Sequence, residues 1–352
     1  YQIFPDRFRF SGIKKQNVPT DRVMRDDIFT EPYWRPTSQG KVLNNDYFGG
    51  DLKGIEEKLD YLESLGVTCL YLNPIFEANS NHRYDTANYE KIDPLLGDEA
   101  DFCSLCASAK KRGISVILDG VFSHTGADSR YFNRENRYSG VGAYNSPDSP
   151  YYDWYKFKKY PDEYESWWGV DILPEVNEEN NGYIEYIAGK KGILRKWLKA
   201  GARGWRLDVA DELSDKFLDE FCKTVKDTSN GEAIIIGEVW ENATEKVAYG
   251  KRRKYLRGSQ LDSVMNYPLR KGIMRFVIDG NAAFLGDVLL SIYSTYPKTV
   301  CDSLMNILGT HDTERALTVF GKGDDNTSDE CGSVLAVKRL SNSQKRAAIK
   351  KT

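Results

Sequence analysis

Residues 51–76 read DLKGIEEKLDYLESLGVTCLYLNPIF and contain one helix followed by one strand. The apolar side chains of the first part fall on a single helical face, and they are Leu52, Ile55, Leu59, Leu62 and Leu65. Asp51 is placed to cap the start of this helix, and Gly66 to end it. The run Val67–Phe76 that follows is typical of a strand buried on both faces of a parallel sheet. The stretch therefore predicts a helix that returns the chain to a parallel strand.

The same alternation recurs along the chain. We predict buried parallel strands over Tyr1–Phe8, Val67–Phe76, Ser115–Phe122, Ala202–Ala210, Ala233–Trp240, Ser263–Leu269 and Ser303–Asp312. Amphipathic helices are predicted over Asp98–Gly113 and Asp211–Val225, in addition to the first one. Because strands alternating with helices at these spacings are βα units, the sequence predicts an α/β fold, a (β/α)8 TIM barrel.

Two connections are longer than ordinary βα loops. Residues 9–45 are polar and irregular, while residues 123–180 are rich in Tyr, Asn, Asp and Pro. We expect 123–180 to form an inserted subdomain over the barrel mouth after the third strand. Residues 1–122 and 181–352 would then form the catalytic barrel.

The last part of the chain lacks a clear strand pattern. After Asp312 there is a charged tail and one helix-like stretch, Val334–Lys351. The eighth strand is therefore expected to be missing from this chain. Since an incomplete barrel exposes unpaired strand edges, we expect the chain to be part of a longer protein.

Composition narrows the classes of function. The chain has 352 residues, 40% of them hydrophobic, and a formal charge of −3, which disfavours binding to nucleic acid. No stretch approaches the roughly 18 apolar residues of a membrane helix. The chain is rich in aromatic residues, with 22 Tyr, 15 Phe and 7 Trp. Flat aromatic faces suit sugar rings, which have apolar faces and polar rims.

The six cysteines follow no disulfide framework. Cys103 and Cys106 form a CxxC pattern, but they lie in a helix-like stretch without a second pair or a histidine cluster. We expect reduced, structural thiols, which favours a cytoplasmic location. Secretion stays open as an alternative.

The chain has three histidines, each beside a carboxylate at a strand end or in the loop that follows. His82 lies in the segment NHRYD, His124 ends the segment DGVFSH, and His311 directly precedes Asp312. A single histidine is more often structural than functional. The repetition of this setting favours a functional site.

Charged residues also end the fourth and fifth predicted strands. Arg206 and Asp208 stand two residues apart, so strand alternation puts both on the same side, and Glu238 ends the next strand. In a barrel these strand ends meet on the face where active sites are built. Arg206 is thus expected to keep Asp208 ionised, as a carboxylate nucleophile requires. A buried ion pair with a purely structural role is the alternative.

These segments resemble the α-amylase superfamily of glycoside hydrolases, which has signature regions at the ends of strands three, four, five and seven. The matching regions here, in order, are Asp119–His124, Gly204–Asp208, Glu238–Trp240 and His311–Asp312. A fifth region, Leu173–Asn177, is similar to that of the neopullulanase, cyclomaltodextrinase and maltogenic amylase subgroup, as are Tyr1–Phe8 and Gly49–Leu52.

The resemblance implies a role for each matching residue. Asp208 is the implied nucleophile, Glu238 the general acid/base, and Asp312 the carboxylate that supports the transition state. Arg206 would orient Asp208. The implied sugar contacts are His124 and His311 to hydroxyls, Tyr84 stacking on the ring, His82 and Asp85 in the same subsite, and Trp240 on the leaving-group side.

The same resemblance implies the reaction. Two carboxyls about 5–5.5 Å apart allow a double displacement that retains the anomeric configuration. Glu238 must carry a proton at the start, and no redox cofactor is needed. The expected partner is an α-glucan substrate. The sequence is silent on oligomeric state. Relatives often form homodimers through an N-terminal module that is absent from this chain, so a homodimer of the full-length protein stays open.

At the positions where many family members bind calcium, this chain has different residues. Many members use an asparagine in the first region and a histidine after the nucleophile, where this chain has Ser123 and Glu212. The calcium loop of the subgroup is replaced by Phe10–Lys15, which offers few oxygen ligands. We therefore expect no calcium and no other metal. Glu175 also replaces the usual lysine of the fifth region.

The leading hypothesis is hydrolysis of α-1,4-glucosidic bonds in maltooligosaccharides, cyclodextrins, pullulan or starch. An α-1,6-glucosidase or a transglycosylase on the same barrel stays open, as does a non-catalytic carbohydrate-binding or transporter-associated relative. An unrelated barrel enzyme using phosphate or a metal is disfavoured, because the sequence has no glycine-rich phosphate loop and no metal-ligand spacing.

Overall fold

The computed structural model describes residues 1–15 and 18–321. The chain divides into two compact units. The first comprises Tyr1–Glu238 and Arg257–Asp262, and the second comprises Val239–Leu256 and the chain from Ser263 onwards. The predicted helix Val334–Lys351 lies outside the described residues.

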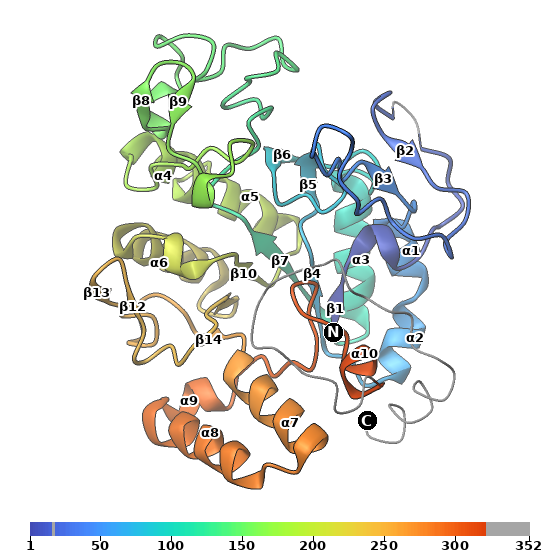
Figure 1. The fold of residues 1–352 in the computed structure, drawn as a ribbon, viewed down its shortest axis with the longest axis vertical. Helices are drawn as coiled ribbons and strands as arrows, with labels where there is room; N and C mark the ends of the chain where they lie inside the picture. Colours follow the sequence, from blue (N-terminus) through green and yellow to red (C-terminus); the bar gives the residue numbers. More distant parts are fainter. Residues whose placement is uncertain (16–17, 322–352) are drawn as a thin grey trace. The chain divides into compact units, whose positions relative to one another are not determined.

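The first unit is built on a parallel sheet (Figure 1). Its neighbouring strands, in order, are β1 (Gln2–Ile3), β4 (Cys69–Leu72), β7 (Ser115–Gly120), β10 (Gly204–Leu207) and β11 (Ile234–Gly237). Each pairs in parallel with the strand beside it. The order in the sheet follows the order in the chain, as expected for consecutive βα units of a barrel.

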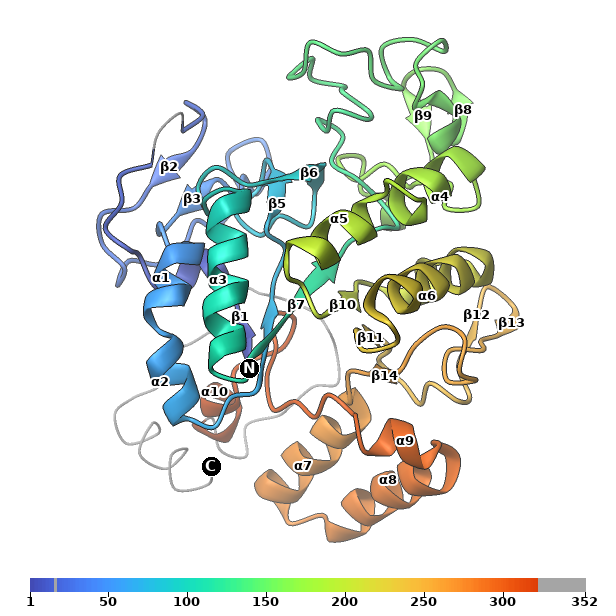
Figure 2. The same cartoon turned by 180° about the vertical axis from the view of Figure 1, so that it is seen from behind.

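Helices connect these strands. They are α1 (Leu52–Glu57), α2 (Leu59–Ser64), α3 (Glu99–Lys111), α4 (Asn181–Ala188), α5 (Ile193–Ala200) and α6 (Asp215–Ser229). Figure 2 shows α1 packed beside α3, which also contacts β7. The helices thus cover the sheet from the outside.

The helix boundaries refine the sequence prediction. The Asp51 side chain accepts a hydrogen bond from the Gly54 amide at 2.6 Å, which confirms the predicted N-cap. The predicted single helix is divided at Lys58, whose amide bonds the Ile55 carbonyl in a tighter turn. Helix α6 begins later than predicted because Ser214 provides its N-cap.

Shorter elements fill the long connections. They are β2 (Val23–Met24), β3 (Asp46–Tyr47), β5 (Phe76–Ala78), β6 (Thr86–Ile92), β8 (Phe157–Lys159) and β9 (Glu163–Tyr164), with 3-10 turns η1 (Pro5–Arg7), η2 (Tyr152–Trp154), η3 (Trp167–Gly169) and η4 (Ala210–Glu212). Strands β5 and β6 form an antiparallel pair, as do β8 and β9.

Aromatic side chains dominate the core between sheet and helices. The Trp197 ring lies 5.2 Å from Phe76 and 5.6 Å from Phe102, joining α5 to α3. Phe122 packs 5.8 Å from Trp205 of β10. Such rings bury large apolar areas, so they hold the helices to the sheet.

Residues 123–180 fold back onto themselves. His124 pairs with Glu175, and Tyr155 with Val176, as isolated antiparallel bridges. Between them Phe132 lies at the centre of an aromatic cluster. The exact boundaries of an inserted subdomain at residues 123 and 180 stay a prediction.

The second unit is largely helical. Its elements are β12 (Val247–Ala248), β13 (Lys251–Arg252), β14 (Ser263–Val264), α7 (Tyr267–Asp279), α8 (Ala282–Thr295), α9 (Lys298–Cys301) and α10 (Ala316–Gly321). The predicted strand Ser303–Asp312 is reduced to one parallel bridge between Met265 and Met305. Within the described residues no strand follows β14, so the chain from 303 to 321 contributes turns and helix.

Two further sequence expectations concern cysteines and membranes. Cys69, Cys103, Cys106, Cys222 and Cys301 are free thiols, and Cys331 lies outside the described residues. Burial raises the pKa of the Cys106 thiol to about 12, unlike the lowered pKa of a redox-active CxxC cysteine. In the described part of the chain, no helix has the length and apolar character needed to cross a membrane.

Two leucines of the first helical segment provide a test of the packing. Leu62 is fully buried, whereas Leu65 is 52% exposed. Replacing Leu62 by Ala should lower the free energy of unfolding by about 2–5 kcal/mol because a cavity is left in the core. Leu65→Ala should change it by less than roughly 0.5 kcal/mol. Denaturant unfolding of both variants measures this, and equal losses would contradict the described packing.

Candidate functional site

A fully buried arginine, Arg206, stands at the centre of the strand ends. Its Nη1 donates to Asp119 Oδ1 at 2.9 Å and to Asp208 Oδ1 at 2.8 Å. Its Nη2 lies 2.9 Å from Glu238 Oε2. One guanidinium therefore holds three buried carboxylates together.

The register of the parallel sheet explains this meeting. Arg206 is the register partner of Asp119 on β7 and of Ile236 on β11. Side chains at matching positions of neighbouring strands project to the same face. Asp208 and Glu238 each follow two residues later, so they project to that face as well. The predicted pairing of Arg206 with Asp208 is confirmed as a contact.

Close backbone packing keeps the strands in this register. Gly204 lies in β10 opposite Ile234, and a Cβ added to it would come within 2.3 Å of the Ile234 carbonyl oxygen. Only glycine allows the two backbones to approach this closely. The glycine thus supports the alignment on which the carboxylate cluster depends.

The cluster is electrostatically coupled. Burial raises the pKa of the Asp208 carboxyl well above its ordinary value, and the charges of Glu238 and Asp119 act in the same direction, while Arg206 lowers it. Three anions around one cation in a buried setting are costly. Burial and the neighbouring anions outweigh Arg206, so they favour the protonated form of the Asp208 carboxyl.

Asp119 is held by tyrosine hydroxyls. Tyr71 and Tyr84 both donate to Asp119 Oδ2, Tyr84 at 2.7 Å. Asn73 Nδ2 donates to the Tyr84 hydroxyl at 3.0 Å. The sequence analysis did not assign Asp119, Tyr71 or Asn73 to the site. The signal for Asp119 was a carboxylate inside an otherwise apolar strand, and Tyr71 and Asn73 share the strand parity that brings them to one face.

The loop after β5 brings Tyr84 and His82 together. Their rings are stacked at 6.0 Å between centroids, and His82 Nδ1 accepts from the Tyr84 amide at 3.0 Å. Tyr84 thereby joins the carboxylate cluster through Asp119. Asp85 accepts hydrogen bonds from the Ser80 amide and hydroxyl, so its carboxylate holds the turn of its own loop.

His124 is buried next to this loop. Its Nε2 bonds the Tyr84 carbonyl oxygen at 3.0 Å, and its Nδ1 bonds the Ser123 hydroxyl at 2.9 Å. Both contacts fit a neutral ring that donates from Nε2. Burial lowers the pKa of His124 to about 4, and nearby His82 adds to the effect. A sugar hydroxyl would have to compete with the Tyr84 carbonyl for the Nε2 proton.

Aromatic residues that the sequence analysis did not assign lie beside His124. The Trp167 ring is 5.4 Å from the His124 ring and stacks on Trp168 at 4.8 Å. Trp168 is 75% exposed, and its Nε1 donates to Glu212 Oε1 at 3.1 Å. The general aromatic richness of residues 131–168 was the only sequence signal for this pair.

The remaining predicted site residues belong to the second unit. His311 Nε2 lies 3.2 Å from Asp312 Oδ1. Trp240 stacks on Tyr267 with 4.0 Å between ring centroids, and it is 48% exposed. These contacts lie within the second unit. That His311, Asp312 and Trp240 share a site with Asp208 and Glu238 stays a prediction.

At the positions expected for calcium, the candidate oxygen ligands are engaged by protein groups. In the loop after β1, the Lys15 ammonium bonds the Asp51 carboxylate, which also accepts from the Ser11 hydroxyl at 2.7 Å. The Ser123 hydroxyl and the Glu212 carboxylate are bound to protein groups as described above. A lysine ammonium placed against a buried carboxylate supplies the positive charge that a cation would bring. Among the described residues, no group of His, Cys, Asp and Glu side chains is arranged to hold a metal.

Comparison with known proteins gives a consistent result. The family model of the alpha amylase catalytic domain matches residues 2–343. The chain is 42% identical to an amylopullulanase of Thermoanaerobacter thermohydrosulfuricus over 97% of this chain and 26% of that protein. It is 37% identical to neopullulanase 2 of Thermoactinomyces vulgaris over 91% of this chain and 51% of that protein. The chain thus spans about a quarter to a half of these relatives.

A solved structure is similar as well. The ligand-free cyclic alpha-maltosyl-(1→6)-maltose hydrolase from Arthrobacter globiformis matches with a TM-score of 0.74 and 33% identity, over 91% of this chain and 66% of that one. Together with the parallel order of the strands, these matches confirm the predicted barrel fold class.

The contact of Lys15 with Asp51 predicts that the stability of the fold does not depend on calcium. Lys15→Met should lower the free energy of unfolding by about 3 kcal/mol, because Asp51 loses the partner of its buried charge. Lys14 is exposed and serves as the matched control as Lys14→Met. Thermal unfolding of the wild type should not shift on addition of EDTA. A lower midpoint in EDTA, or equal effects of the two substitutions, would contradict the prediction.

The buried imidazole predicts a dependence of stability on pH. The unfolded chain binds a proton on His124 near pH 6.5, whereas the low pKa in the folded state keeps the ring neutral down to about 4. Its contribution is therefore complete above pH 6.5 and is lost as the pH falls towards 4, by roughly 3 kcal/mol at most. Urea unfolding from pH 7 to 4 should show a shallower decline for His124→Asn, and parallel curves would refute this.

Proposed function

Because this chain belongs to the alpha-amylase catalytic-domain family, we propose that it is the catalytic part of a retaining glycoside hydrolase. The proposed reaction is cleavage of α-1,4-glucosidic bonds in maltooligosaccharides, cyclodextrins, pullulan or starch. The curated relatives are named as enzymes of this kind: amylopullulanase, neopullulanase, cyclomaltodextrinase and maltogenic alpha-amylase.

The observation that carries the proposal is the contact of Arg206 with both Asp208 and Glu238. A double displacement needs one carboxylate as nucleophile and a second carboxyl group that carries a proton. When two carboxyl groups lie close to one cation, one can be ionised while the other keeps its proton. Both carboxyls contact Arg206, and burial raises the pKa of Asp208, so these contacts alone do not distinguish the two roles. Following the family resemblance, we assign the nucleophile, which is ionised when it reacts, to Asp208 and the proton to Glu238.

The steps follow from this assignment. Asp208 attacks the anomeric carbon, the glycosidic C–O bond breaks, and Glu238 gives its proton to the leaving oxygen. A covalent glycosyl ester on Asp208 results. Glu238 then takes a proton from a water molecule, which attacks the same carbon and breaks the ester. Two inversions leave the α-configuration unchanged, and no cofactor takes part.

Tyr84 and His82 are proposed to form the wall of the sugar subsite. Tyr84 is half-buried and is fixed by Asp119 and Asn73, so its ring is held in place before the substrate arrives. Preorganised contacts of this kind limit the cost of orienting the reacting atoms. His124 positions the Tyr84 segment through its bond to the Tyr84 carbonyl.

Roles for three further residues follow from the family resemblance. Following the family resemblance, we propose that Asp312 and His311 bind hydroxyls of the sugar being cleaved. Trp240, whose ring is held by Tyr267, would contact the leaving group. Asp85 is proposed to act indirectly, since Ser80 engages its carboxylate.

An α-1,6 specificity or a transglycosylase activity is the second candidate. It is favoured by the similarity to an amylopullulanase and to a hydrolase whose name contains an α-(1→6) linkage. Incubation of the full-length protein with pullulan separates the possibilities. Panose would indicate cleavage of α-1,4 bonds, maltotriose would indicate cleavage of α-1,6 bonds, and longer products would indicate transfer.

The free thiols at the described cysteines support a cytoplasmic location. Homodimerisation of the full-length protein is proposed on the family resemblance alone.

The three carboxylates provide the main test. Asp208→Asn, Glu238→Gln and Asp312→Asn should each lower kcat on a chromogenic maltoside by about 10⁴-fold or more, since groups that act as a unit are each indispensable. Early products followed by NMR should have the α-configuration.

The controls are isosteric changes of exposed carboxylates on α6, Asp227→Asn and Glu220→Gln. They should leave kcat unchanged. Equal activity of the wild type and Asp208→Asn would favour a non-catalytic carbohydrate-binding role, and β-configured products would exclude the retaining mechanism.

A further inference from the structure

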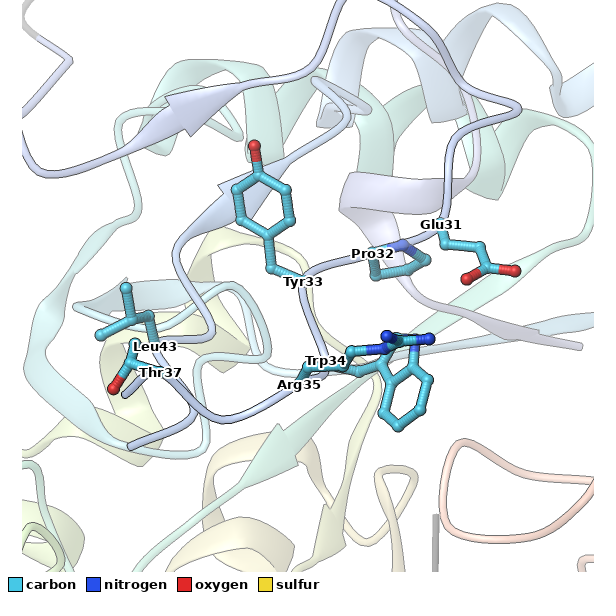
Figure 3. Close-up of a pocket in the computed structure, with 7 residues that line it drawn as sticks. All are labelled: Glu31, Pro32, Tyr33, Trp34, Arg35, Thr37 and Leu43. Atoms are coloured by element: carbon cyan, nitrogen blue, oxygen red, sulfur yellow. The ribbon is translucent and has the colours of Figure 1, made fainter. Parts of the chain in front are cut away.

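A hollow lies in the long connection between β1 and α1 (Figure 3). Its cavity volume is about 340 Å³, which falls at the lower end of the range of small-molecule sites. Pro32, Trp34 and Leu43 provide apolar walls. Glu31, Arg35 and Thr37 add polar side chains. The hollow therefore combines an aromatic surface with hydrogen-bonding groups.

Trp34 is the main aromatic surface of this hollow. The guanidinium carbon of Arg35 lies 5.1 Å from the centroid of its ring, and Figure 3 shows the two side chains running together. A guanidinium over an aromatic face is attracted by the ring and limits its rotation. It also presents fixed donors next to the apolar ring. This pairing of an apolar face with adjacent donors matches the apolar face and polar rim of a sugar.

A buried carboxylate joins the hollow to the candidate site. Asp46, which is fully buried, accepts from the Tyr33 amide through Oδ2 at 3.0 Å and from Asn81 Nδ2 through Oδ1 at 3.1 Å. The Asn81 amide also donates to the Asn44 carbonyl at 2.7 Å. Asn81 directly precedes His82. The wall of the hollow and the loop that carries the sugar-contacting residues are thus fastened to the same group.

From these contacts we propose that the hollow is a secondary binding site for glucose residues of an α-glucan chain. Trp34 provides the stacking surface, while Glu31, Arg35 and Thr37 bind hydroxyls on the rim. The choice of glucan rests on the proposed function, and the shared contacts of Asp46 connect the hollow to the loop that carries His82 and Tyr84. Short substrates would not reach it.

Binding is measured on the full-length protein carrying Glu238→Gln, so that the probe, maltoheptaose, is not cleaved. Addition of Trp34→Ala should weaken the binding of maltoheptaose roughly fivefold to tenfold in calorimetric titration, as expected for loss of one stacking contact. The matched control is Phe29→Ala, an aromatic residue of the same loop that is 83% exposed and does not line the hollow. It should leave the binding unchanged.

Kinetics of the otherwise unaltered enzyme give a second measurement. Trp34→Ala should lower kcat/KM on soluble starch by a similar factor and leave kcat/KM on a short chromogenic maltoside unchanged. A thermal midpoint equal to that of the wild type shows that the variant is folded. A parallel loss on both substrates would indicate a structural role for Trp34 and would overturn the proposal.

Failure of this inference is distinguishable from failure of the proposed function. If the wild type hydrolyses α-glucans and Trp34→Ala binds maltoheptaose as tightly as Phe29→Ala does, the secondary site is refuted and the hydrolase stands. If the wild type cleaves no α-glucan, binding of maltoheptaose that depends on Trp34 still supports the site. Absence of both refutes both.

Discussion

The contact of one buried guanidinium with three carboxylates is the constraint on which the rest of the first unit depends. Arg206 cannot lose its charge, and an unpaired charge in this position would be very costly. Its partners Asp119, Asp208 and Glu238 come from three neighbouring strands. A shift of one residue in β7 or β11 would turn Asp119 or Glu238 away from the Arg206 guanidinium. The charge of Arg206 is therefore balanced only when the strands of the sheet pair in the observed register.

The surroundings of the cluster satisfy the remaining polar groups. The hydroxyls of Tyr71 and Tyr84 donate to the second oxygen of Asp119, and Asn73 in turn bonds Tyr84. Such networks are favourable only when each member has a partner. The network also fixes the Tyr84 hydroxyl beside the carboxylate cluster. The same hydrogen bonds therefore satisfy buried polar groups and fix the position of Tyr84.

Loops far apart in the sequence are joined by single buried charges. Asp51 binds the Lys15 ammonium and caps α1, and Asp46 links the segment around Tyr33 with Asn81. In each case a carboxylate fastens the connection after β1 to the body of the unit. These ion pairs and hydrogen bonds explain how a long polar loop can be ordered by groups of its own chain. The Asp46 contacts also fasten the segment that leads to Trp34 to the loop that carries His82 and Tyr84.

The sequence by itself determined the alternation of helices and strands, the N-cap at Asp51 and the common side of Arg206 and Asp208. These features depend on local periodicity and on neighbours within a few residues. It did not reveal that Asp119 and Tyr71 belong to the cluster, that the helix is divided at Lys58, or that the stretch from Ser303 forms only a bridge. The membership of Asp119 and Tyr71 in the cluster and the single bridge near Ser303 were decided by the tertiary structure, because they depend on pairing between segments distant in the chain. The division at Lys58 is a local change of backbone conformation that the apolar pattern does not encode. Whether a carboxylate faces a guanidinium, a metal or solvent is settled only when those strands and loops pack.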